Sequence, residues 1–103
     1  MKSRYYAKDG SPMNILEWGA NLVDADYNRV ASTTLPDGKW VLTRWRGIDW
    51  DYVLGEPPLI FQTRVLEHEG DLLGEDFDAA RYPTEAEALT GHEAMVAKWT
   101  HEA

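Results

Sequence analysis

Cysteine is missing from the 103-residue chain, so a disulfide framework and thiolate metal sites are excluded, and a reducing compartment is indicated. Long apolar runs are missing too, since none approaches the ~20 residues that span a bilayer. The basic start of the chain, Met1 to Tyr6, is not followed by the apolar segment of a signal peptide. These absences predict a soluble, cytoplasmic protein without a membrane partner.

Motifs of common catalytic and cofactor sites are also missing. There is no phosphate-binding glycine loop and no Gly-x-Ser-x-Gly elbow. His68, His92 and His101 each precede a glutamate, but none is followed by a second histidine four residues later, as a zincin helix requires. Three Asp-x-Asp pairs lack the further oxygen ligands that a hard cation needs. These pairs are Asp24/Asp26, Asp49/Asp51 and Asp76/Asp78. We expect no metal, no cofactor and no catalytic motif.

Basic side chains are scarce in the last third of the chain. Residues 67–103 contain ten acidic side chains against Arg81 and Lys98, whereas residues 1–66 contain eight of each sign. The whole net charge of −8 therefore lies in the last third. Because such a surface repels phosphate backbones and anionic membranes, we expect no direct binding to nucleic acid.

The patterning that is present predicts a single α+β domain over residues 1–103. Two amphipathic helices are predicted, one over about 15–25 and one after Thr84, because Asn14 and Thr84 are each followed three residues later by glutamate in a capping box. Strands are predicted over 3–7, 27–35, 40–46 and 59–66, with a further short strand over 79–82. The resulting order is β-α-β-β-β-(β)-α. Hairpin-length links favour an antiparallel meander with both helices packed on one face, and 67–78 is predicted to be an acidic loop.

Alternation along the two longest strands separates two sides of the sheet. One side has Val41, Thr43, Trp45, Leu59, Phe61, Thr63 and Val65, and the other has Trp40, Leu42, Arg44, Arg46, Ile60, Gln62, Arg64 and Leu66. If the helices cover the first side, the second is an exposed surface of the composition that protein-binding sites favour. The candidate partner-binding residues are Trp40, Arg44, Arg46, Trp50, Tyr52, Gln62 and Arg64. The alternative is that Trp40, Leu42 and Ile60 pack under a long loop, with the arginines extending over them.

Three segments resemble a group of small proteins of actinobacteria and their bacteriophages. They are Asp26 to Ala31, the Pro-Pro-Leu-Ile-Phe strand within Pro57 to Thr63, and the Gly-His-Glu helix within Arg81 to Val96. The resemblance runs from the first helix to the last. It implies a phage or prophage setting in a bacterial host cell, with virion association left open, and it supplies no catalytic residues.

Three functions are compatible with these features. The first is a small protein-interaction module of phage or prophage type that docks on another protein, or on its own copy, through the Trp/Arg side of the sheet. The second is an acidic decoy that binds a basic, nucleic-acid-handling protein by imitating a row of phosphates. Its candidate residues are Glu67, Glu69, Asp71, Glu75, Asp76 and Asp78. The third is a small enzyme that uses His92 as a buried base, although a core histidine bonded to a strand carbonyl or a tyrosine explains the same position.

Overall fold

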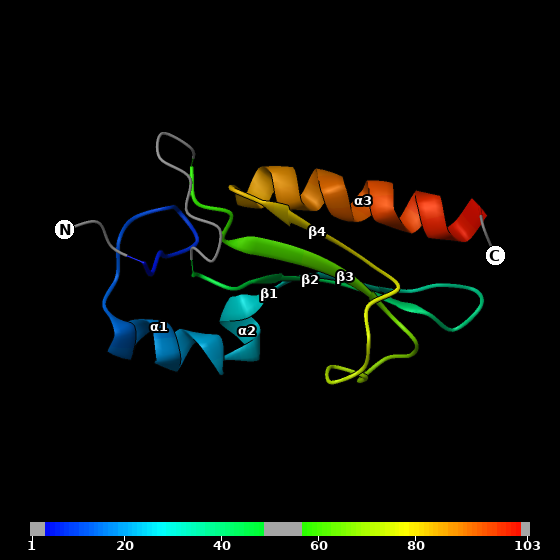
Figure 1. Ribbon diagram of the computed structural model, residues 1–103, viewed down its shortest axis with the longest axis horizontal. Helices are drawn as coiled ribbons and strands as arrows, with labels where there is room; N and C mark the ends of the chain where they lie inside the picture. The colour runs from blue at the N-terminus through cyan, green and yellow to red at the C-terminus, as the bar shows by residue number, and fades with distance from the viewer. Residues whose placement is uncertain (1–3, 49–56, 102–103) are drawn as a thin grey trace.

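The chain forms one antiparallel sheet with helices, seen in a computed structural model that describes residues 4–48 and 57–101. The elements follow the order α1 (Ile15–Leu22), α2 (Ala25–Asn28), β1 (Arg29–Thr34), β2 (Trp40–Trp45), β3 (Phe61–Leu66), β4 (Asp78–Tyr82) and α3 (Glu85–His101). The strands are neighbours in sequence order, β1-β2-β3-β4, and each pairs antiparallel with the next. The α+β class and the antiparallel meander are confirmed (Figure 1).

The helices begin where the capping residues predict. The Asn14 side chain accepts a hydrogen bond from the backbone N–H of Glu17 at 2.9 Å and donates one to the Glu17 carboxylate at 2.7 Å. Thr84 accepts from the backbone N–H of Glu87 at 3.1 Å. Each cap satisfies a backbone donor that the first helical turn leaves without a partner.

Helix α2 was not predicted from the sequence. The Asp24 carboxylate accepts from the backbone N–H groups of Asp26 and Tyr27, which closes one short helical turn. The strand predicted over 27–35 therefore begins only at Arg29. The strand predicted over 3–7 does not join the sheet, because Tyr5 and Tyr6 form single bridges with Ile48 and Pro12.

Helix α3 covers one side of the sheet and contacts all four strands. Figure 1 shows α3 along this side and places α1 and α2 on the other side, near one end of the sheet. The expected packing of both helices on one face therefore applies to α3 alone. No residue of α1 is buried, and Trp18 and Leu22 pack at the edge of the core.

The core lies between α3 and the sheet and continues to the N-terminal segment. Trp45 is fully buried beside Phe61 and Ile60, and its indole N–H donates to the carbonyl oxygen of Tyr6 at 2.9 Å. Gly47 has a φ of 66°, and a Cβ there would overlap the Trp45 ring. Glycine is therefore required at this turn, where the chain leaves β2 against the Trp45 ring.

Within residues 4–48 and 57–101, no helix is long and apolar enough to cross a membrane.

Candidate functional site

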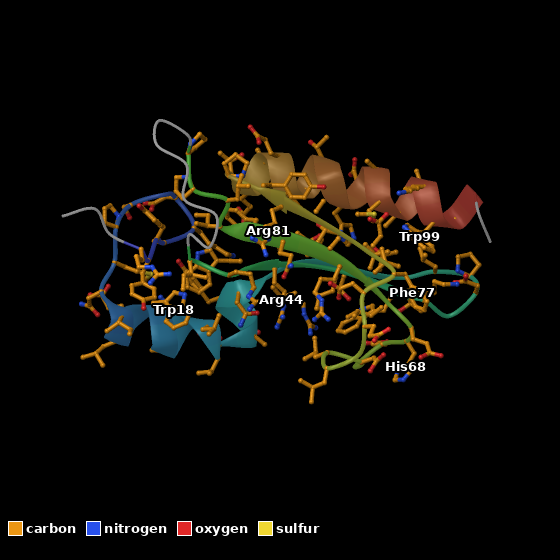
Figure 2. All side chains as sticks on the ribbon, viewed as in Figure 1. Trp18, Arg44, His68, Phe77, Arg81 and Trp99 are labelled. Atoms are coloured by element: carbon orange, nitrogen blue, oxygen red, sulfur yellow. The ribbon has the colours of Figure 1, made fainter. Side chains whose placement is uncertain are left out.

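A row of polar side chains crosses the whole sheet on the side that α3 does not cover. The strand register pairs Arg29 with Arg44, Arg44 with Gln62, and Gln62 with Arg81, so the four strands contribute one residue each. Arg44 and Arg81, which Figure 2 labels, mark the middle and one end of this row. Arg46 follows β2 and donates from Nη1 to the Gln62 side-chain oxygen at 3.1 Å. We call these five residues the arginine face.

The arginine face carries positive charges that repel one another. Like charges directly opposite on neighbouring strands destabilise a sheet, and Arg29 lies directly opposite Arg44. Burial lowers the pKa of Arg44, and the nearby guanidinium groups of Arg46, Arg64 and Arg29 lower it further. Burial also lowers the pKa of Arg46, with smaller effects from Arg64 and Arg81. Stability of the isolated fold therefore does not explain this row.

Three of these arginines have no carboxylate partner in the part of the chain that the structure describes. The ion pairs among residues 4–48 and 57–101 involve Lys8, Lys39, Arg64 and Lys98, and none involves Arg29, Arg44 or Arg46. Arg44, Arg46 and Gln62 are half-buried, while Arg29 is exposed. The side chains are thus positioned by the sheet and leave their charges available to an anionic ligand.

The apolar side chains of the predicted binding surface are buried. Trp40, Leu42 and Leu66 form a separate cluster with exposures of 2%, 1% and 0%. The indole N–H of Trp40 donates to Ser32 at 2.7 Å, and the guanidinium of Arg29 lies 5.7 Å from its ring centroid. Trp40 is therefore not an exposed contact residue, and the packing alternative holds for it.

Arg64 lies directly opposite Leu42 in the sheet and binds a loop on the same side. Its guanidinium pairs with Asp76 and donates to the carbonyl oxygens of Leu72 at 2.9 Å and Gly74 at 3.0 Å. These contacts hold the loop 67–77 on the side of the sheet away from α3 (Figure 1). Arg64 thus fixes the position of this loop, and its predicted role in partner binding is replaced by a structural one.

The remaining predicted residues divide into two groups. Arg44, Arg46 and Gln62 lie together on the arginine face, as strand alternation predicts. Trp50 and Tyr52 lie outside the described residues. The sequence analysis did not predict Arg29 or Arg81 as members of the row. Arg29 belongs to it only because of a register shift between Arg29 and Ala31, which alternation does not reveal. Arg81 pairs with Gln62, but the loop before β4 gives no indication of that register in the sequence.

His92 lies on the opposite side of the sheet, under α3. It is 5% exposed, its Nε2 is 2.9 Å from the Thr33 hydroxyl, and its Nδ1 is 2.8 Å from the Thr43 hydroxyl. Thr43 is in turn 2.6 Å from Thr63. Both ring nitrogens have protein partners, so the core-histidine interpretation is favoured over a catalytic base, although the partners are threonines rather than a carbonyl or tyrosine.

The acidic residues of 67–78 do not form one free row. Asp76 pairs with Arg64, and the Asp78 carboxylate accepts from Lys98 at 2.7 Å and from the Trp99 indole at 3.0 Å. These two hydrogen bonds lower the pKa of Asp78. No group of three His, Asp or Glu side chains among residues 4–48 and 57–101 could hold a metal ion. Because two of its six acidic side chains form ion pairs within the protein, this segment is a weaker candidate site than the arginine face.

Burial of His92 has a consequence for stability at acidic pH. Burial lowers the pKa of His92 below its usual 6.5, against a smaller opposing effect of Glu93, so the folded protein takes up this proton less readily than the unfolded chain. The contribution of His92 is therefore intact above about pH 6.5 and is lost as the pH falls through the lowered folded-state pKa. We expect the free energy of unfolding to decrease between about pH 7.5 and about pH 5.

Denaturant unfolding across this pH range, compared with a His92→Gln variant, checks the expectation. The His68→Gln background is used for both proteins, because the hydrogen bond with the Glu69 carbonyl raises the pKa of His68 and gives the opposite pH dependence. An equally steep slope in the His92→Gln protein would contradict the assignment.

The chain matches no family model, and no curated protein or solved structure is significantly similar to it. The arginine face lies on the side of the sheet away from α3, and its Arg29, Arg44 and Arg46 pair with no carboxylate of residues 4–48 and 57–101. It is the feature on which function is argued below.

Proposed function

We propose that this protein is an interaction module that binds an acidic segment of a partner protein through the arginine face. The observation that carries the proposal is the cross-strand row Arg29–Arg44–Gln62–Arg81, which places like charges on adjacent strands. Such an arrangement destabilises the free protein, and an anionic partner relieves the repulsion. Arginine is also among the residues that contribute most to protein–protein binding energy.

A short acidic protein segment suits this face better than a long polyanion. The loop 67–77 lies on the same side of the sheet and carries Glu67, Glu69 and Glu75 as exposed side chains. These carboxylates repel a nucleic acid that extends beyond the row. An acidic peptide of a few residues contacts the arginines and ends before the loop.

The setting of this interaction is part of the proposal. The resemblance of the Pro57 to Thr63 and Arg81 to Val96 segments to actinobacterial and phage proteins supports a phage or prophage protein that acts in the cytoplasm of the host cell. In that setting the partner is a host or phage protein with an exposed acidic segment, or another copy of this chain.

Binding of an acidic peptide tests the proposed function. A fluorescent peptide of alternating Asp and Glu is titrated with the full chain, and fluorescence anisotropy gives Kd. The double variant Arg44→Gln, Arg81→Gln is expected to bind roughly 100-fold more weakly, because each charged hydrogen bond contributes about 1.5–3 kcal/mol and 1.4 kcal/mol corresponds to a factor of ten.

The matched control is the double variant Lys39→Gln, Lys98→Gln, which removes the same charge from residues paired elsewhere with Asp37 and Asp78. Its affinity for the peptide is expected to stay close to that of the parent chain, and thermal unfolding verifies that both variants fold. An equal loss in both variants would show that the peptide responds to net charge alone. Tighter binding of a single-stranded DNA of the same length would overturn the choice of partner.

A further inference from the structure

The loop 67–77 places an acidic side chain of the protein itself beside the arginine face. Arg64 follows Gln62 by two residues on β3, so the two side chains project from the same side of the sheet. The Arg64 guanidinium pairs with the Asp76 carboxylate and also donates to two backbone carbonyl oxygens of the loop. The protein thus already binds a short acidic segment at this guanidinium, and the segment is its own loop.

Arg64 is also a close neighbour of the row of the arginine face. Arg44 lies directly opposite Gln62, and Arg64 is the next residue of β3 on the same side, so Arg44 and Arg64 are diagonal neighbours. Such positions are about 7–8 Å apart, a distance that long side chains reach across. Burial has the largest effect on the pKa of Arg44, and the Arg64 charge is among those that lower it further. A partner segment that extends from the row toward the loop therefore meets the guanidinium that Asp76 occupies.

The loop 67–77 is held mainly by contacts at the protein surface. All of its residues except Asp71 and Gly74 are exposed, and Leu73 is fully exposed. The Asp76 side chain keeps 32% of its exposure although it pairs with Arg64. Ion pairs that water can reach contribute little to stability, and segments with few buried apolar contacts open at a low cost in free energy. A competing anion can therefore displace this loop while the sheet stays folded.

We propose that the loop 67–77 is an autoinhibitory segment, which competes with the partner for the arginine face. In the free protein Arg64 has a structural role and holds the loop through Asp76. When the acidic segment of the partner reaches Arg64, its carboxylate replaces that of Asp76, and the loop leaves its position beside the row. The inference deepens the proposed function and rests on it, because the loop and the partner offer the same chemical group to the same face.

Two acidic peptides of different length test the competition. A peptide of about five residues spans the row, and a peptide of about ten residues also reaches Arg64. Fluorescence anisotropy with the full chain gives the Kd of each peptide. Asp76→Asn is expected to bind the longer peptide about fivefold more tightly, because the apparent affinity rises with the fraction of molecules in which the loop has left Arg64. The affinity for the shorter peptide is expected to change by less than about twofold.

Glu75→Gln is the matched control, because it removes the same charge from the preceding, exposed residue of the loop. Its expected effect on the affinity for the longer peptide is less than about twofold. Asp76→Asn is also introduced into an Arg64→Gln protein, where it is expected to have no effect because its partner is absent. An equal gain from Glu75→Gln, or a gain that persists without Arg64, would assign the effect to net charge and overturn the autoinhibitory contact.

NMR of the ¹⁵N-labelled full chain shows whether the loop moves. The backbone amide signals of Leu72 and Gly74 report its position, because the carbonyl groups of these two residues accept from Arg64. We expect these signals to shift when the longer peptide is added. Binding of the longer peptide without such shifts, and with equal affinity for the parent and Asp76→Asn proteins, would overturn the inference and leave the proposed function standing. Absence of binding of both peptides to both proteins would overturn the proposed function itself, and the inference with it.

Discussion

Replacement of Trp45 by alanine is expected to lower the free energy of unfolding by about 3–5 kcal/mol, the range for truncation of a large buried aromatic side chain. Trp45 is fully buried, donates to the Tyr6 carbonyl, and meets the Tyr27 ring edge-on at a centroid distance of 4.9 Å. These contacts connect β2 to the N-terminal segment and to α2. Their loss therefore affects three parts of the molecule together.

Urea unfolding followed by circular dichroism measures this effect. Trp45→Phe is the matched control, because it keeps an aromatic ring and removes the hydrogen bond to Tyr6. Its expected loss is clearly smaller than that of Trp45→Ala. A loss below about 1 kcal/mol for Trp45→Ala would contradict the central role of this side chain.

Replacement of His92 by alanine is expected to lower the free energy of unfolding by about 2–4 kcal/mol. The substitution removes a buried ring from the contact between α3 and the sheet. It also removes the hydrogen bond between His92 and the half-buried Thr33 hydroxyl. The buried Thr43 hydroxyl loses one of its two partners and keeps Thr63.

A double-mutant cycle distinguishes this network from ordinary packing. His92→Ala is combined with Thr43→Val, and the two changes are expected to be non-additive by about 0.5–3 kcal/mol, as for residues that share one hydrogen-bond network. Thr90→Ala, on the exposed part of α3, is the control and is expected to change stability by less than about 0.5 kcal/mol. Strict additivity would contradict a shared network.

Local signals in the sequence predicted much of the fold. The capping boxes at Asn14 and Thr84 place the starts of α1 and α3, and alternation places Thr43 and Thr63 on the α3 side of the sheet. These features depend on residues a few positions apart, whose geometry the backbone fixes. The side on which α1 lies was not predictable in this way, because it depends on the short turn that Asp24 closes.

The candidate site was predicted only in part, for a related reason. Arg44, Arg46 and Gln62 share a side by alternation alone, and the register confirms it. Trp40 and Leu42 are buried on the side of the sheet where Arg64 holds the loop 67–77 through contacts eight to twelve residues away in sequence. No periodic pattern in the sequence reports such a contact, so alternation alone left both exposure and packing open for Trp40 and Leu42.

The register shift at Val30 determines how far the arginine face extends across the sheet. Without this extra residue, alternation would turn Arg29 to the α3 side, and the row would end at β2. With it, the row crosses all four strands, and three strand spacings of about 4.8 Å give a length of about 14 Å. An extended chain covers this distance with about four or five residues, so one added residue in β1 sets the length of the partner segment in the interaction that we propose.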